Sequence, residues 1–388
     1  MSYYILPSFS SNLEVNNISI VLGNNEEILS RSLYNYLNFM KQQIDTYEQS
    51  WDIYKKYTNP YEYIHTLIPN FKQSVSKLKP ISRSFYKLIE IFNMLRMDED
   101  FTNSINSFHL AEGPGGFIEA MVHLRQSFKN DKYYGMTLIN ENCNIIPGWK
   151  KSLNFLNKHE NIFLEYGIDK KGDLFNIDNL WYCYNKYRGS MDIITGDGGF
   201  DFSVDFNKQE INANKLIFSQ MCFAIAMQKK NGTFILKIFD VFTEATIDIL
   251  YILSQLYKKI YIVKPNTSRY ANSERYIICK YFKNDNILPI LTKLAHIYPF
   301  INANISIKRF LNIDIPYIFI NKLEDINAII GQQQLENILT TFYLIENSKE
   351  EKIDTIKKNN IQKCIQWCIK YKIPYNKTCQ ALNMFYKD

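Results

Sequence analysis

The chain has 388 residues, a formal net charge of +6, 46% hydrophobic residues and 22% charged residues. This composition excludes a disordered chain, and no apolar run reaches the ~20 residues that a helix needs to cross a bilayer. Seven scattered cysteines, and an N-terminus without the basic start and apolar stretch of a signal peptide, indicate a soluble intracellular protein.

Three regions follow one another along the chain. Residues 1–80 are predicted to be mainly helical, since apolar residues recur at helical spacing between residues 29 and 57. In residues 81–283, short apolar runs alternate with helical patterns, which predicts an α/β fold with a mostly parallel sheet and helices on both faces. The last two runs of this region fit an antiparallel pair at one edge. Residues 284–388 are predicted to be helical again.

A glycine-rich turn follows the first strand of the middle region. The sequence SFHLAEGPGGF places Gly113, Pro114, Gly115 and Gly116 between a strand and a helix, where glycines allow a ligand to approach the backbone. The G-x-G-x-x-G and P-loop patterns are not matched, which counts against a nicotinamide-dependent oxidoreductase. The turn suits a compact cofactor such as S-adenosylmethionine. A plain β–α turn that needs glycines is the alternative.

Four charged residues flank predicted strands. Asp197 follows an apolar strand, Lys237 lies inside the run FILKIF, Glu274 precedes the run RYIICKYF, and Lys87 lies on a helix before the first strand. Each alone is more often a strand-end or solvated charge. The strand ends of an open α/β sheet face one crevice, so the four side chains can meet there. A lysine buried among apolar residues must be paired or neutral, which makes Lys237 a candidate general base.

This pattern resembles the K-D-K-E ribose 2′-O-methyltransferases of the FtsJ-like class. The closest resemblance is to the branch of cap-specific mRNA (nucleoside-2′-O-)-methyltransferases that act on the first transcribed nucleotide. The phrases that carry it are NPYEYI (59–64), GPGGF (113–117), YGMTL (134–138), GDGGF (196–200), LKIFDVFT (236–243) and KPNTSRYANSERYIICK (264–280). The resemblance covers roughly residues 41–283 and leaves both ends outside it.

The resemblance implies a Rossmann-like domain that uses S-adenosylmethionine to convert cap-0 to cap-1 at the 5′ end of capped mRNA. The catalytic residues carried over are Lys87, Asp197, Lys237 and Glu274. The cofactor-binding residues carried over are Ser82, Ala111, Glu112, Gly113, Pro114, Gly115, Gly116, Phe117, Asp173, Leu174 and Asp197. The substrate-binding residues carried over are Lys41, Lys55, Asn207, Lys208, Gln209 and Asn272. Residues 1–80 would lie on the cap side.

The roles follow from the chemistry of the reaction. A ribose 2′-hydroxyl is a weak nucleophile and needs a base within hydrogen-bond reach, and we assign that base to Lys237. Asp197 would orient Lys237, and Glu274 would position Lys87 or Lys237. No metal is required. Cys364 and Cys368 stand four apart on a predicted helix, where buried small side chains are favoured over half of a zinc site.

Two features depart from related patterns. Gly135-Met136-Thr137 ends the second strand, where many folds that bind S-adenosylmethionine have an acid for the ribose hydroxyls. Cellular members often continue into further domains, so the compact chain would fit a virus or a similar cytoplasmic element, and we expect the cytoplasm, a viral factory or a virion rather than the nucleus. The end regions could support packing, dock a capping-complex partner or clamp RNA.

Two other functions stay open. The first is a ribose 2′-O-methyltransferase of ribosomal or transfer RNA, against which NPYE and the TSRYANSERY phrase argue. The second is a non-catalytic RNA-binding or regulatory subunit of a capping complex, against which the presence of all four charged residues argues.

Overall fold

The computed structural model describes residues 3–9, 13–23, 28–140, 146–199, 209–303, 305–347 and 349–382. The strands are β1 (Tyr3–Leu6), β2 (Ile18–Leu22), β3 (Asn106–Leu110), β4 (Lys132–Met136), β5 (Ile162–Glu165), β6 (Met191–Gly196), β7 (Gln228–Ile238), β8 (Tyr257–Val263), β9 (Arg275–Phe282) and β10 (Ile307–Leu311). The helices are α1 (Arg31–Gln43), α2 (Glu48–Tyr57), α3 (Ser84–Met94), α4 (Met97–Asp100), α5 (Gly116–Leu124), α6 (Leu153–Leu156), α7 (Ile177–Tyr187), α8 (Gln209–Met227), α9 (Glu244–Leu256), α10 (Leu288–Ala295), α11 (Tyr298–Asn302), α12 (Tyr317–Asn347) and α13 (Glu350–Lys370).

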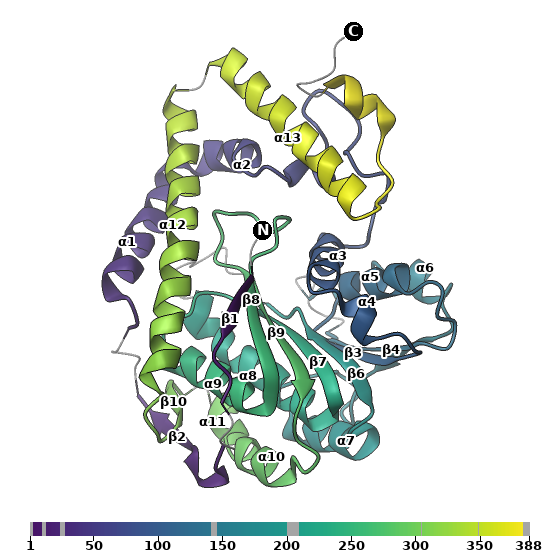
Figure 1. The fold of residues 1–388 in the computed structure, drawn as a ribbon, viewed down its shortest axis with the longest axis vertical. Coiled ribbons are helices and arrows are strands. Elements are labelled where there is room, and N and C mark those ends of the chain that lie inside the picture. Colours follow the sequence, from purple (N-terminus) through teal and green to yellow (C-terminus); the bar gives the residue numbers. More distant parts are fainter. Residues whose placement is uncertain are drawn as a thin grey trace.

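The described residues form one eight-stranded sheet with the order β1-β8-β9-β7-β6-β3-β4-β5 (Figure 1). Neighbours from β7 to β5 in this order pair in parallel, whereas β7–β9, β8–β9 and β1–β8 pair antiparallel. The predicted α/β fold is therefore confirmed, and so is the antiparallel pairing of the last two runs. The carboxyl ends of β3, β4, β5, β6 and β7 lie along a single edge, which we call the carboxyl edge.

Both faces of the sheet are covered by helices. Because successive side chains of a strand point to opposite faces, β7 contributes to both hydrophobic cores. Phe234 and Leu236 belong to the core that contains α8 and α9, whereas Ile235 belongs to the core that contains α3 and α5. A continuous apolar run such as FIL is the pattern expected of a strand buried on both sides.

The terminal regions are less helical than expected. Tyr3–Leu6 forms β1, which pairs with β8 and so occupies the edge predicted for the antiparallel pair, and β2 pairs with β10 from the C-terminal region. Strands this short show no clear period, so the sequence pattern did not reveal them. We propose domain boundaries near residues 80 and 283. Strand β1 belongs to the N-terminal region but pairs with β8 of the central sheet.

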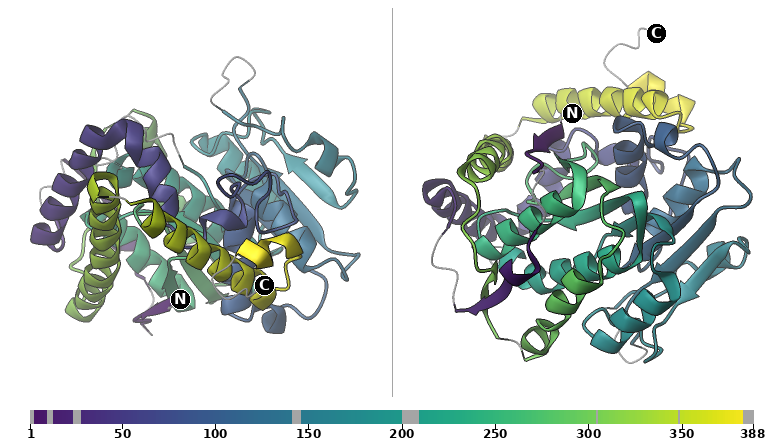
Figure 2. Two further views of the ribbon diagram at one scale, coloured as in Figure 1. Left: turned by 90° about the horizontal axis from the view of Figure 1, so that it is seen from above. Right: turned by 60° about the horizontal axis from the view of Figure 1, so that its bottom comes forward.

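The two terminal regions also pack on each other. Tyr47 and Trp51 contact the ring of Phe342 on α12, and Asn360 on α13 donates to the main-chain oxygen of Tyr57. Figure 1 and Figure 2 show α2 and α13 lying beyond the carboxyl edge. Cys364 and Cys368 are buried on α13 in the second core, and the described residues hold no group of three metal-ligating side chains.

No helix within the described ranges has the length and apolar content to span a membrane.

A buried ion pair fixes the opposite, amino-terminal edge of the sheet. Arg125 donates to Asp131 through Nε, at 2.5 Å from Oδ2, and through Nη2, at 3.2 Å from Oδ1. The rest of its guanidinium donates to the main-chain oxygens of Phe101 and Asn103. Asp131 also accepts from the amide of Ile105 and from Tyr133. Both partners are almost fully buried, so neither charge is solvated if the other is lost.

We therefore expect Arg125→Leu to lower the free energy of unfolding by about 3–5 kcal/mol, because it leaves the Asp131 carboxylate buried without its countercharge. Lys230→Ala, which removes an exposed ion pair with Asp285, is the matched control and should cost under about 1 kcal/mol. Urea unfolding curves measure both. An Arg125→Leu loss no larger than that of the control would contradict this reading of the pair.

Candidate active site

The four charged residues singled out in the sequence meet at the carboxyl edge as two lysine–acid pairs. Lys87 Nζ on α3 lies 2.6 Å from Glu274 Oε1, just before β9. Lys237 Nζ on β7 donates to the main-chain oxygen of Asp197, just after β6, at 2.6 Å and lies 3.4 Å from its Oδ1. All four side chains are at most 15% exposed. The topology thus places two ammonium groups and two carboxylates in one buried site.

Burial and charge act against each other in this site. Burial lowers the pKa of Lys87 from its usual value, although Glu274 opposes this shift. Burial alone would raise the pKa of Glu274, but the nearby Lys87 and Lys237 ammonium groups outweigh it and hold that pKa far below its usual range. Glu274 is therefore an anion at neutral pH, and it holds the Lys87 ammonium in place.

The glycine turn joins β3 to α5 beside these pairs. Gly115 has φ +114°, which favours glycine, and a Cβ at Gly116 would come within 2.1 Å of Ser84 Oγ and 2.2 Å of Ser82 Oγ. Gly116 is thus needed for packing within the chain, as the interpretation of a plain β–α turn supposes. The Oε1 atom of Glu112 accepts from the amides of Phe117 and Ile118 and so caps α5.

One atom of the turn lacks a partner among the described residues. Oε2 of Glu112 is buried and makes no hydrogen bond there. Burial raises the pKa of Glu112 to about 8, although the two amide donors oppose that shift. A buried, unsatisfied carboxyl oxygen is costly. A ligand with an ammonium or another donor would satisfy it, and the amino-acid end of S-adenosylmethionine carries such a group.

The remaining proposed cofactor residues surround this turn. Ser82 shares a short hydrogen bond with Ser84 at the start of α3. Gly113 donates to Thr137 Oγ1 at 3.1 Å. A Cβ at Gly172 would lie 2.2 Å from the main-chain oxygen of Thr137, so the 172–174 segment packs on the same strand end.

Within that segment the two assigned residues are already engaged. Asp173 Oδ1 accepts from the amide of Phe175 at 2.8 Å. Leu174 is buried in the first core.

The proposed substrate residues are placed less uniformly. Lys41 is buried, and its Nζ lies 2.9 Å from Asp240 Oδ2. Because its ammonium group is paired inside the protein, we no longer assign Lys41 to the RNA contacts. Lys55 pairs with Asp52 on α2. Gln209 begins α8 and accepts from Ser273 Oγ at 2.6 Å. Asn207 and Lys208 lie outside the described residues.

Asn272 belongs to the loop between β8 and β9, which is heavily anchored. Buried Lys264 donates to the main-chain oxygens of Asn272, at 2.6 Å, and Glu274, at 2.9 Å. Burial lowers the pKa of Lys264 to about 7. Ser268 Oγ donates to Asn272 Oδ1 and to Glu274 Oε1. These contacts fix the backbone and the carboxylate of Glu274.

Two acids hold the same loop from outside. Glu90 on α3 accepts from the amides of Asn266 and Thr267 and from the Thr267 hydroxyl. Glu62 of the NPYE phrase accepts from both Nε and Nη2 of Arg269, at 3.0 and 2.6 Å. Although burial opposes the shift, Arg269 lowers the pKa of Glu62 to about 2. The spacing of Lys87 and Glu90 on one helical face is a signal that could have revealed Glu90.

Tyr276 is a further site residue that sequence reasoning missed. It is fully buried, lies opposite Lys237 in the β7–β9 register, and donates to Asp197 Oδ1 at 2.8 Å. Its ring packs against Phe117 of the glycine turn, with centroids 6.0 Å apart. Glu274 and Tyr276 are two residues apart at the start of a strand, so strand alternation places them on one side.

Comparisons with known proteins identify the family of this chain. The FtsJ-like methyltransferase family matches residues 80–282. A cap-specific mRNA (nucleoside-2′-O-)-methyltransferase 1 of Trypanosoma cruzi is 36% identical over 173 residues, which is 43% of this chain and 45% of that protein. A cap-specific mRNA (nucleoside-2′-O-)-methyltransferase 2 of Pongo abelii is 25% identical over 297 residues, which is 72% of this chain and 37% of that protein.

The match thus spans less than half the length of both relatives. Among solved structures, a ribosomal RNA methyltransferase of Plasmodium falciparum aligns with a TM-score of 0.37 and 20% identity, over 52% of this chain and 97% of that chain. The family match covers more than half of the sequence and includes all four residues of the two lysine–acid pairs, so the chain belongs to the FtsJ-like methyltransferase family.

Proposed function

We propose that this protein transfers a methyl group from S-adenosylmethionine to the ribose 2′-hydroxyl of the first transcribed nucleotide of capped mRNA. The observation that carries the proposal is the pair of buried lysine–acid contacts beside the glycine turn. The names of the relatives from Trypanosoma cruzi and Pongo abelii support capped mRNA as the substrate. The 5′ end of capped mRNA is accordingly the proposed partner.

The residues of the glycine turn fit the cofactor. The partnerless Glu112 oxygen suits its ammonium group, and it belongs to the turn from Ala111 to Phe117 that we assign to the cofactor. Ser82 borders the turn at Gly116, and Asp173 follows Gly172, which packs on Thr137 next to the turn. When bound, S-adenosylmethionine supplies an electrophilic methyl group on a positively charged sulfur. Among the described residues, the Asp197 carboxylate accepts one hydrogen bond, from Tyr276, at Oδ1, which is also the oxygen nearest Lys237. We assign Oδ2 to the side that faces the cofactor charge.

We assign the general base to Lys237. Lys87 is already committed to Glu274 at 2.6 Å, whereas the shortest contact of Lys237 is to a neutral main-chain oxygen. A Cβ at Gly199 would come within 3.1 Å of Lys237 Nζ, so glycine there keeps the amine accessible. Lys237 then takes the proton that the 2′-hydroxyl loses.

Asp197 and Tyr276 position that base. Tyr276 holds Oδ1 of Asp197, and the same Asp197 presents its main-chain oxygen to Lys237. Lys87 and Glu274 define the other wall of the site. Fixing the base and both reactants in line can contribute ~7–11 kcal/mol to lowering the barrier, without further covalent chemistry.

The substrate is tested with three short RNAs and labelled S-adenosylmethionine. One RNA is capped, one is uncapped, and one is capped with a 2′-O-methyl group already on its first nucleotide. We expect label on the first RNA alone. Label on the premethylated RNA would indicate that a nucleotide other than the first is methylated. Equal label on the uncapped RNA would contradict the requirement for a cap and indicate a different RNA class. No label on any RNA would favour the alternative that the protein is a non-catalytic regulatory subunit of a capping complex.

Lys237→Ala tests the base. We expect at least a 10²-fold loss of methyl transfer, because a positioned base contributes about 10²–10⁴-fold. Cofactor affinity, measured by calorimetry, should change little. Lys229→Ala, at the exposed start of the same strand, is the matched control and should keep full activity. Wild-type activity in Lys237→Ala would refute the assignment.

Tyr276→Phe tests the positioning role. Loss of one hydrogen bond to a charged acceptor is worth about 1.5–3 kcal/mol. We therefore expect kcat to fall at least tenfold while KM for capped RNA and the melting temperature change little. Tyr133→Phe, which removes a buried tyrosine hydrogen bond to Asp131 away from the site, is the control. Equal kcat losses in the two variants would show that Tyr276 acts through general stability.

A further inference from the structure

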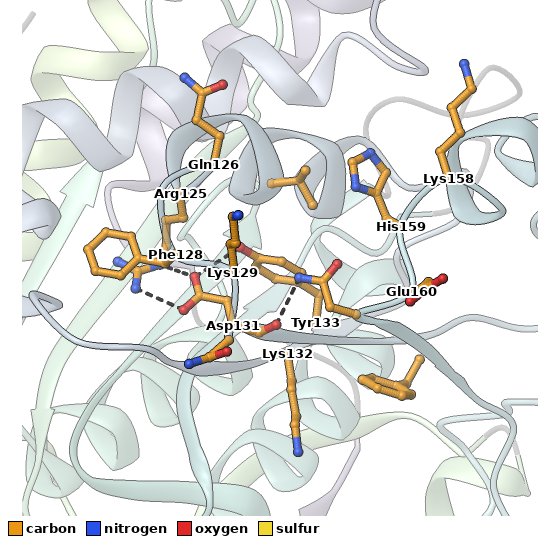
Figure 3. Close-up of a pocket in the computed structure, with 14 residues that line it drawn as sticks. Arg125, Gln126, Phe128, Lys129, Asp131, Lys132, Tyr133, Lys158, His159 and Glu160 are labelled. Atoms are coloured by element: carbon orange, nitrogen blue, oxygen red, sulfur yellow. Dashed lines mark hydrogen bonds and ion pairs between the residues drawn. The ribbon is translucent and has the colours of Figure 1, made fainter.

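A concave surface lies at the opposite end of α5 from the glycine turn. It is a pocket of about 790 Å³, lined by residues from the end of α5 to the start of β4 and by residues before and within β5 (Figure 3). The nine residues of α5 span ~13.5 Å at 1.5 Å per residue. The pocket is thus separate from the candidate active site but only one short helix away.

The charge at this pocket is unbalanced. Arg125 and Asp131 neutralise each other in its wall, where Figure 3 draws their contacts. Lys129, Lys132 and Lys158 are exposed, and none of them has an ion-pair or side-chain hydrogen-bond partner within the described parts of the chain. The remaining carboxylate in the lining is that of Glu160. The surplus of positive charge favours an anionic ligand.

The lysines point to an extended anion rather than a single phosphate. In Figure 3, the side chains of Lys132 and Lys158 extend in opposite directions from the pocket, so their ammonium groups do not converge on one point. A chain of phosphates can contact both. Phe163 on β5 is 42% exposed in the same lining. The Phe163 ring stacks on Tyr134, with centroids 5.3 Å apart, and an exposed aromatic ring in a positively charged groove is a surface on which unpaired bases stack.

The positive surface continues back to the candidate active site. Trp149 packs against the glycine turn, since a Cβ at Gly115 would lie 3.7 Å from its ring. Lys150 and Lys151 follow directly, are exposed, and have no ion-pair partner in the described ranges. The short helix α6 then leads to Lys158 at the pocket. We call Lys150, Lys151, Lys158, Lys129 and Lys132 the lysine track.

We propose that the lysine track binds single-stranded RNA on the 3′ side of the nucleotide that is methylated, with Phe163 as a stacking surface. This inference rests on the proposed function, because it assumes an RNA whose 5′ end lies at the carboxyl edge. The track then holds the body of the RNA by its phosphates, without regard to sequence.

The test compares Lys129→Glu/Lys132→Glu/Lys158→Glu with a matched control, Lys258→Glu/Lys259→Glu/Lys322→Glu, which changes charge equally at β8 and α12. Methyl transfer is measured on capped RNAs of four and of twenty nucleotides. We expect the track variant to raise KM for the long RNA at least tenfold. Its kcat on both RNAs and its KM for the short RNA should stay within twofold of the wild-type values. The control variant should change neither KM nor kcat for either RNA. Equal KM effects on both lengths, or in both variants, would overturn the proposal.

A second measurement does not depend on activity. Binding of a fluorescent, uncapped twenty-nucleotide RNA is followed by anisotropy at several salt concentrations. Each phosphate contact on a single strand contributes about 0.7 to the salt slope, so loss of three should reduce the slope by about 2. An unchanged slope in the track variant overturns the proposal, whereas absent methylation with a reduced slope refutes only the proposed function. Binding of an acidic polypeptide in preference to RNA would assign the track to a protein partner and also overturn it.

Discussion

The cost of burying charge organises the carboxyl edge of the sheet. An ammonium or carboxylate removed from water must find a partner, and here Lys87 finds Glu274 across 187 positions of sequence, at 2.6 Å. That pair ties α3 to the loop before β9. Glu90, one turn further along α3, accepts the amides of the same loop. Helix and loop thus hold each other, and the position of Glu274 beside the glycine turn depends on both.

The terminal regions extend this network instead of standing apart from it. Asp240, three residues after Lys237, is buried between Lys41 of α1 and Arg275 at the start of β9. Asn327 of α12 accepts from the same arginine. Glu62, from the segment after α2, holds Arg269 of the loop. Polar side chains contributed by both ends of the chain therefore brace the loop and strand that carry Glu274 and Tyr276.

Helix α5 links two surfaces with different chemistry. At its N-terminus, the glycine turn and Glu112 form a buried, partly unsatisfied cradle suited to a small ligand. At its C-terminus, the Arg125–Asp131 pair stiffens a wall from which exposed lysines extend. A helix of fixed length between them sets the distance between these two surfaces.

The sequence by itself determined the fold class, the order of the motifs and the meeting of Asp197 and Lys237, because the carboxyl ends of neighbouring parallel strands lie together in any open parallel sheet. Lys87 on α3 and Glu274 before the antiparallel β9 reach the same site through tertiary packing. The sequence also located the glycine turn, since that conformation leaves few residue choices. Only the tertiary structure decided which charges pair, because that depends on contacts between distant segments. The tertiary structure shows Lys41 as a buried partner of Asp240 and identifies Tyr276 through its register with Lys237. It also places β1 at the edge of the sheet, which was not expected because a strand of four residues has too short a pattern to be predicted from the sequence.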